Sequence, residues 1–185
     1  VMFMKIYNTL SHKEEVFIPW EEGKVSFYTC GPTVYHYAHI GNMRNYIGHD
    51  ILDKTLRFIG FDVTRCMNIT DVGHLTSDSD SGDDKMVASA KKEHKTVLDI
   101  ASFYTDAFFK DFDALNCKRP EIVSNATDNI EEYIKIITKL LKDGYAYKAG
   151  GNVYFDTSKL KDYYVLTNHK EDDMVVGARE SVEFD

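Results

Sequence analysis

The feature that most constrains the fold of this chain is a succession of strand, glycine turn, helix and strand between residues 25 and 69. Residues 25–29 are mostly β-branched or aromatic, which predicts a short strand, and the Cys-Gly-Pro of residues 30–32 is a turn signal. Residues 61–69 predict a second strand. Two strands joined through a helix form a parallel βαβ unit with a right-handed crossover. We therefore predict an α/β fold with a Rossmann-like parallel sheet.

The segment between these strands has the apolar periodicity of one amphipathic helix. Its apolar stripe consists of Ile40, Met43, Ile47, Ile51, Leu52, Leu56 and Ile59. Gly60 follows the stripe and predicts the end of the helix. Ligands of such sheets bind at the carboxyl ends of the strands. Here those ends are residues 30–39 and 68–71.

The second half of the chain predicts two more helices and a hairpin. One amphipathic helix covers residues 97–115, and another runs from a cap at Thr127 or Asp128 through Leu141 to a stop at Gly144. Residues 145–156 are typical of a β-hairpin, with Ala-Gly-Gly-Asn at the turn. We predict a nucleotide-binding half in residues 1–85 and a helical and β-hairpin insertion in residues 86–185.

Composition excludes several classes of protein. Of the 185 residues, 43% are hydrophobic and 13% aromatic, enough for a sizeable core and too many for a disordered chain. A net charge of −8 makes a poor non-specific nucleic-acid binder, but it leaves room for ATP or for a local basic patch. There is no apolar run of about 18 residues and no apolar signal core. The three widely spaced cysteines predict no disulfide framework, so we expect a cytoplasmic protein.

The four residues His39-Ile40-Gly41-Asn42 stand at the predicted start of the first long helix. A helix N-terminus offers free N–H groups and the positive end of the helix dipole, and Gly41 lets a ligand approach the backbone closely. His39 and Asn42 can each donate a hydrogen bond to a phosphate oxygen. These properties suit ATP and the charge that develops on its α-phosphate as pyrophosphate leaves. Taken alone, a histidine in this place is more often a helix cap or a packed residue.

Several segments of the chain together form a distinctive pattern: residues 28–35, residues 36–44, the Asn-Ile-Thr-Asp-Val of residues 68–72, residues 110–116, Arg119-Pro120, Ala126-Thr127 and the Gly-Tyr-Ala-Tyr of residues 144–147. This pattern resembles the cysteinyl-tRNA synthetase family of class I aminoacyl-tRNA synthetases. The resemblance runs over essentially the whole chain and keeps the family's order. It implies that residues 1–85 are the first half of the Rossmann-like catalytic domain and that residues 86–185 are its connective insertion.

The resemblance implies the activity of a cysteine–tRNA ligase. Cysteine would react with ATP, accompanied by Mg²⁺, to give cysteinyl-adenylate, and the cysteinyl group would pass to the 3′ end of tRNA(Cys). His39, Gly41 and Asn42 match the family's ATP-binding motif, and His39 and Asn42 take its catalytic positions. Asn42 replaces the last histidine of that motif and keeps a side-chain hydrogen-bond donor. The resemblance further implies a monomer with no membrane partner.

The resemblance also implies a zinc ion and an amino-acid pocket. Cys30 matches the first zinc ligand of the family, and Gly31, Thr33 and Thr70 match positions that line the cysteine and adenylate site. Zinc suits this task because it binds a thiolate readily and keeps an open position for the substrate, so it favours cysteine over serine. Without the motif, Cys30 reads as a small buried residue at a strand end. One departure is His36, where the family more often has aspartate.

Other candidate sites have simpler interpretations. Residues 78–84 are acidic, but their glycine and twelfth position do not fit a calcium-binding EF-hand loop, so we predict a solvated loop. His36, His39, His49 and His74 lack the spacing of a metal site. We predict packing roles for Cys66 and Cys117. We also predict core positions, in preference to a base-stacking platform, for Phe103, Tyr104, Phe108, Phe109 and Phe112.

Parts of the family pattern are missing from this sequence. It has no Lys-Met-Ser-Lys-Ser loop, no later zinc ligands and no anticodon-binding region. We expect an N-terminal part of a longer enzyme that does not form cysteinyl-adenylate alone. Three alternatives stay open: a related ligase that joins cysteine to an amino-sugar acceptor, a truncated non-catalytic paralogue that binds tRNA or a partner protein, and a small nucleotidyltransferase.

Overall fold

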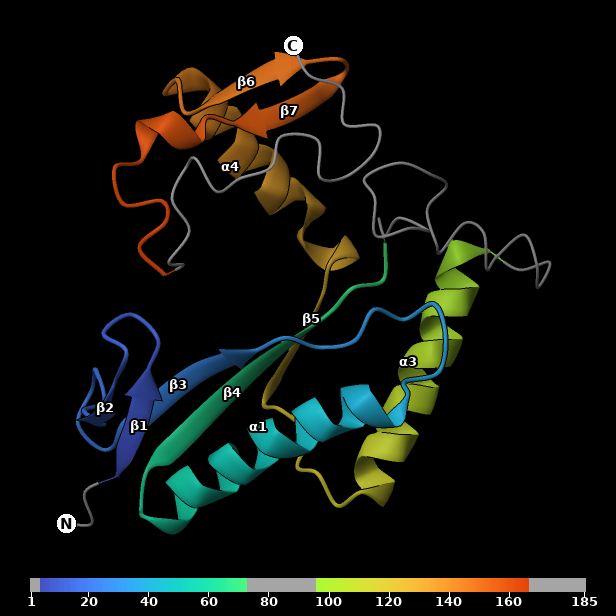
Figure 1. The fold of residues 1–185 in the computed structure, drawn as a ribbon. Coiled ribbons are helices and arrows are strands. Elements are labelled where there is room, and N and C mark those ends of the chain that lie inside the picture. Colours follow the sequence, from blue (N-terminus) through green and yellow to red (C-terminus); the bar gives the residue numbers. More distant parts are fainter. Residues whose placement is uncertain (1–3, 73–95, 167–185) are drawn as a thin grey trace.

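The computed structural model describes residues 4–72 and 96–166, which form an α/β fold around a parallel sheet (Figure 1). The sheet contains β3 (Lys24–Thr29), β4 (Asp62–Ile69) and β5 (Ile122–Asn125), in the order β3-β4-β5. Both neighbouring pairs are parallel, with Lys24 opposite Asp62 in the first and Cys66 opposite Ile122 in the second. The Rossmann-like parallel sheet expected from the sequence is therefore confirmed.

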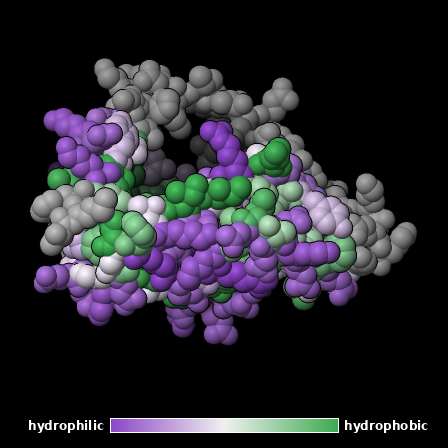
Figure 2. Space-filling view, turned by 90° about the horizontal axis from the view of Figure 1, so that it is seen from below, coloured by the Kyte–Doolittle hydropathy of each residue, from purple (hydrophilic) through white to green (hydrophobic). Residues whose placement is uncertain are grey.

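Helix α1 (Ile40–Phe58) makes the crossover from β3 to β4, as the apolar stripe predicted. The chain turns out of the helix at Ile59 and Gly60, and Gly60 has a φ of 104°, a conformation that glycine adopts without a Cβ penalty. In Figure 1 the helix lies below the sheet. The view from below in Figure 2 shows a surface that is mostly hydrophilic, with hydrophobic residues in smaller groups.

The main core lies where α1, α3 (Val97–Ala114) and the carboxyl end of β4 meet. It buries Val34, Met43, Tyr46, Met67, Ile69, Ile100, Ala101, Phe108, Phe109, Phe112 and Cys117. The core positions predicted for Phe108, Phe109 and Phe112 are confirmed, as is the packing role of Cys117, whereas Phe103 is exposed. None of the described helices is long and apolar enough to cross a membrane.

The chain beyond β5 forms a separate layer, seen in the upper part of Figure 1. It consists of a short 3-10 helix, η1 (Thr127–Asn129), then α4 (Ile130–Lys142), the antiparallel hairpin of β6 (Ala146–Ala149) and β7 (Asn152–Phe155), and a second 3-10 helix, η2 (Thr157–Lys159). The predicted helix and hairpin are confirmed. The predicted cap was wrong, because Thr127 and Asp128 lie inside η1 and Asn129 stands at the N-cap of α4.

Two features were not expected from the sequence. An antiparallel hairpin of β1 (Lys5–Asn8) and β2 (Lys13–Val16) precedes the sheet. The second is β5, which lies within the predicted insertion but pairs with β4, so the sheet draws on both predicted parts of the chain. The predicted boundary at residues 85 and 86 and the acidic loop of residues 78–84 lie outside the described residues, and this domain division stays a prediction.

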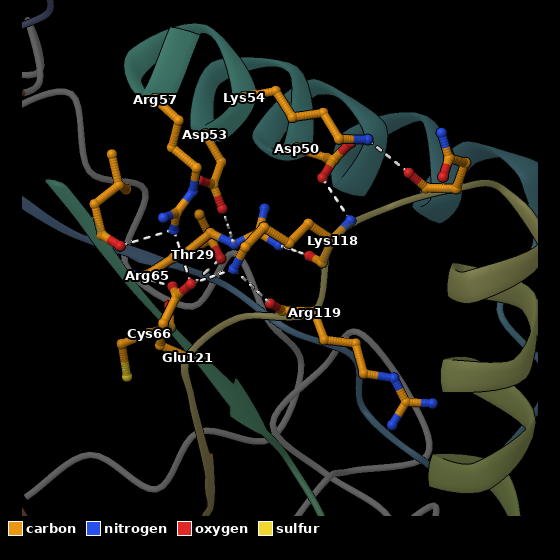
Figure 3. Close-up of polar contacts among 12 residues, drawn as sticks. Thr29, Asp50, Asp53, Lys54, Arg57, Arg65, Cys66, Lys118, Arg119 and Glu121 are labelled. Atoms are coloured by element: carbon orange, nitrogen blue, oxygen red, sulfur yellow. Dashed lines mark hydrogen bonds and ion pairs between the residues drawn. The ribbon is translucent and has the colours of Figure 1, made fainter. Parts of the chain in front are cut away.

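A cluster of charged side chains, of which Asp53 and Arg65 are fully buried, joins α1 to β4 and to the segment before β5 (Figure 3). Asp53 binds Arg57 through an Oδ1–Nε contact of 2.5 Å and pairs with Arg65 Nε at 3.4 Å. Arg65 also donates to the carbonyl of Lys118, and its own N–H donates to Glu121 at 2.8 Å. Although burial tends to raise the pKa of Glu121, its bonds to Lys118 and to this N–H lower it to about 2. Glu121 therefore stays charged at neutral pH.

Candidate functional site

A cavity of about 220 Å³ opens at the carboxyl end of β3, beside the N-terminus of α1. Its lining comes from the loop after β3, from α1 and from α3: Gly31, Pro32, Thr33, Val34, Tyr35, His36, Ala38, His39, Asn42, Tyr46, Tyr104 and Phe108. Four of the predicted site residues therefore meet here, namely Gly31, Thr33, His39 and Asn42. The place agrees with the general position of ligand sites in open parallel sheets.

His39 is the N-cap of α1. Its Nδ1 accepts a hydrogen bond from the Gly41 N–H at 3.0 Å, and its own N–H donates to Asn42 Oδ1 at 3.2 Å, which completes a capping box. A neutral imidazole that accepts at Nδ1 carries its proton on Nε2. The side chain is exposed and lines the cavity, so the cap leaves a donor at Nε2 for a ligand.

Gly41 and Asn42 complete the helix start. A Cβ on Gly41 would lie 2.8 Å from His39 Cε1, so the glycine makes room for the imidazole above the first turn. Asn42 Oδ1 accepts from the His39 N–H in the capping box, and the two Nδ2 donors of the amide stay available to a ligand. Asn42 lines the cavity and Gly41 does not. The arrangement presents an imidazole donor, an amide donor and a helix N-terminus to one volume, which is the chemistry of an anion site.

Asn68 at the end of β4 organises the neighbouring strand end. Its Oδ1 accepts from the Gly31 N–H at 2.8 Å and from the Tyr28 hydroxyl at 2.7 Å, and its Nδ2 donates to Thr70 Oγ1 at 3.1 Å. Thr33 and Thr70 form a parallel bridge just beyond. Asn68 belongs to the Asn-Ile-Thr-Asp-Val motif, but the sequence did not indicate its role, which comes from contacts between residues up to 40 positions apart.

Cys30 and Thr70 lie beside this cavity but outside its lining. Cys30 is an exposed free thiol at the end of β3. Zinc sites in proteins take at least three protein ligands, and the described residues contain no group of three His, Cys, Asp or Glu side chains placed to hold a metal. The described part of the chain therefore does not by itself fit a zinc ion, and no chemical step is assigned to one here.

Asp71 ties the sheet to the layer above it. This buried carboxylate accepts from the Thr127 N–H at 3.0 Å and from the Thr127 hydroxyl, while the Ala126 N–H donates to the Ile69 carbonyl at 2.9 Å. The end of β4 thus fixes both the cavity wall and the start of η1. Both segments belong to the family resemblance, but nothing in the sequence predicted that they are in contact.

Gly31 has no space for a side chain, which gives a direct prediction. A Cβ there would lie 1.7 Å from the Asn68 carbonyl oxygen, so Gly31→Ala must push the ends of β3 and β4 apart. We expect a loss of about 1–3 kcal/mol in the free energy of unfolding, measured by urea denaturation. The control is Gly48→Ala, where no atom lies within 4 Å of the added Cβ. Equal stability of the two variants would contradict the prediction.

Comparison with known proteins assigns the chain to a family. A family model described as "tRNA synthetases class I (C) catalytic domain" matches residues 16–184. A protein named cysteine–tRNA ligase in Treponema denticola is 56% identical over 178 residues, which cover 96% of this chain and 36% of the relative. Proteins of the same name in Treponema pallidum and Zymomonas mobilis are 51% and 50% identical, over 88% and 89% of this chain.

The chain spans about a third of the length of these curated relatives, from 31% to 36%. The match nevertheless includes the whole of the cavity and all the strands of its parallel sheet. The chain belongs to the family of class I tRNA synthetase (C) catalytic domains.

Proposed function

We propose that this chain provides the ATP- and cysteine-binding wall of a cysteine–tRNA ligase. The observation that carries the proposal is the single cavity in which Gly31, Thr33, His39 and Asn42 meet at the carboxyl end of β3. The names of relatives that are 50–56% identical to the chain support the choice of cysteine as the amino acid. The related amino-sugar ligase, the non-catalytic paralogue and the small nucleotidyltransferase are not favoured by any particular contact.

In the proposed first step, an oxygen of the cysteine carboxylate attacks the α-phosphorus of ATP. The bond from that phosphorus to the bridging oxygen breaks, pyrophosphate leaves, and cysteinyl-adenylate remains. His39 Nε2–H and Asn42 Nδ2–H donate to phosphate oxygens, and the N-terminus of α1 adds its dipole to the stabilisation of the developing charge. Mg²⁺ accompanies the ATP and screens its phosphates.

Gly31, Thr33 and Thr70 shape the cysteine end of the site in this proposal. In the second step, a hydroxyl of the terminal adenosine of tRNA attacks the carbonyl carbon of the adenylate and releases AMP. Cys30 is proposed as one zinc ligand, with its other ligands outside the described residues. We further propose that the protein acts as a monomer in the cytoplasm with ATP, L-cysteine and tRNA(Cys) as its partners.

The test is amino-acid-dependent exchange of radiolabelled pyrophosphate into ATP, measured on the protein purified from its source. We expect exchange with cysteine and little exchange with serine. The two amino acids differ only in that serine has a hydroxyl where cysteine has a thiol. Transfer of labelled cysteine to tRNA is the second readout, and it separates a tRNA ligase from a ligase with another acceptor. Exchange that is no faster with cysteine than without any amino acid would contradict the proposal.

A further inference from the structure

Tyr46 is a cavity residue to which neither the motif nor the proposed mechanism gives a role. It lies on α1 four residues after Asn42, so the two side chains share one face of the helix. The residue is only 5% exposed, and it lines the same cavity as His39 and Asn42. Its ring packs edge-to-face on Phe108, with the centroids 5.0 Å apart.

The hydroxyl of Tyr46 makes no hydrogen bond with any of the described residues. Buried tyrosine hydroxyls normally have a partner, because an unpaired polar group inside a protein lowers stability. The Tyr46 oxygen is not among the fully enclosed atoms that lack a partner. It therefore keeps access to solvent, and the cavity is the space that this side chain lines.

The surroundings of Tyr46 keep it a neutral donor. Burial, and then the nearby Cys30 thiol, raise the pKa of Tyr46 to about 12, so the phenol holds its proton at neutral pH. Tyr46 shares the cavity with His39 at the helix N-terminus and with Gly31 at the end of β3. In the proposed function, these two places hold the phosphate and the amino acid.

We propose that the Tyr46 hydroxyl donates a hydrogen bond to an oxygen of the substrate in this cavity, at the junction of the cysteine carboxylate and the α-phosphate. The inference rests on the proposed function of the same site and adds to it a residue that contacts the substrate. The hydroxyl has no hydrogen-bond partner among residues 4–72 and 96–166, so it is available to an acceptor that a ligand brings into the cavity. The donor is neutral, so it can bind an anionic oxygen without adding a charge to the core.

Tyr46→Phe tests this inference cleanly, because the variant removes only the hydroxyl and leaves the ring against Phe108. We expect kcat/KM for cysteine-dependent pyrophosphate exchange to fall about tenfold, the effect of losing one hydrogen bond. We expect the midpoint of urea unfolding to stay the same or to rise, since no residue in the described part of the chain accepts a hydrogen bond from the hydroxyl. Tyr145→Phe is the control, because Tyr145 stacks on Phe155 in the layer above the sheet.

Each outcome of this experiment has a definite meaning. Unchanged exchange in Tyr46→Phe would overturn the inference, while the proposed function would stand on the activity of the unmodified protein. A fall in exchange that accompanies an equal fall in stability would also overturn it, because the hydroxyl would then serve the fold. Absence of cysteine-dependent exchange in the unmodified protein would remove the proposed function, and with it the role of Tyr46.

Discussion

Replacing His39 by Asn is expected to lower the rate of cysteine-dependent pyrophosphate exchange by about 10²–10³-fold, the typical cost of removing one donor to a developing oxyanion. His39 has two separable tasks. Its Nδ1 caps α1 through the Gly41 N–H, and its Nε2–H is free to donate to a phosphate. Asparagine is among the best N-cap residues, but its shorter side chain cannot cap the helix and also reach the place of Nε2.

His39→Ala separates the two tasks. Alanine removes both the cap and the donor, and loss of an N-cap costs about 0.5–2 kcal/mol of stability. We expect the alanine and asparagine variants to be equally slow in exchange, and only the alanine variant to unfold at lower urea concentration. If the asparagine variant kept the activity of the unmodified protein, His39 would be a capping residue alone, which is the simpler interpretation of this motif.

Local sequence patterns were sufficient for the elements around the cavity. The stripe from Ile40 to Ile59 predicted α1 because one apolar face of a long helix repeats at a fixed spacing, and Gly60 marked its end. The turn at Gly150 and Gly151 predicted the β6–β7 hairpin, and both glycines have positive φ angles. These elements carry their own signals and need no distant partner to be recognised.

The missed elements lack such signals. Strand β5 has only four residues and no alternation of buried and exposed positions, so its place in the sheet comes from backbone pairing with β4. Strand β2 is Lys-Glu-Glu-Val and is exposed throughout, which hides it from any search for apolar periodicity. Edge and surface strands of this kind are defined by the strands with which they pair, and a single sequence does not show which strands pair.

The functional site also combines residues that have a local sequence signal with residues whose roles depend on distant contacts. The His39–Asn42 motif and the glycine turn contain four residues that line one cavity, because a helix N-terminus after a strand is a local feature. The role of Asn68 depends on contacts with Tyr28 and Gly31, which lie 40 and 37 positions away. The roles of such residues follow only from the register of β3 against β4.

The burial of charges on α1 could not be predicted from the sequence either. Aspartate and arginine at helical spacing are typical of a helix face exposed to solvent. In the structure, Asp53 and Arg65 have no exposed side-chain surface, and Asp53 holds both Arg57 and Arg65. Burying two charges is costly, and the cost is offset only while each keeps its partner. The cluster in Figure 3 therefore fixes α1 against β4, and the same helix carries His39 at its other end.

Asp53→Ala is expected to lower the free energy of unfolding by about 3–5 kcal/mol, the range found when one partner of a buried pair is removed. The variant leaves the Arg65 guanidinium buried with the Lys118 carbonyl but without its carboxylate. Urea denaturation followed by circular dichroism measures the change. The matched control is Asp113→Ala, which breaks a two-pronged pair with Arg119 that is half exposed, so we expect a much smaller loss of stability than for Asp53→Ala.

The double variant Asp53→Leu with Arg65→Met measures what the buried pair contributes to the free energy of unfolding. Replacing a whole buried ion pair by apolar residues of similar size is often neutral or stabilising, so this variant should recover much of the stability that Asp53→Ala loses. Arg57 limits the recovery, because it also loses its contact with Asp53 and keeps only Glu121 and the Val63 carbonyl. A double variant as unstable as Asp53→Ala would mean that the cluster acts through Arg57, and that the Asp53–Arg65 contact adds little to holding α1 on the sheet.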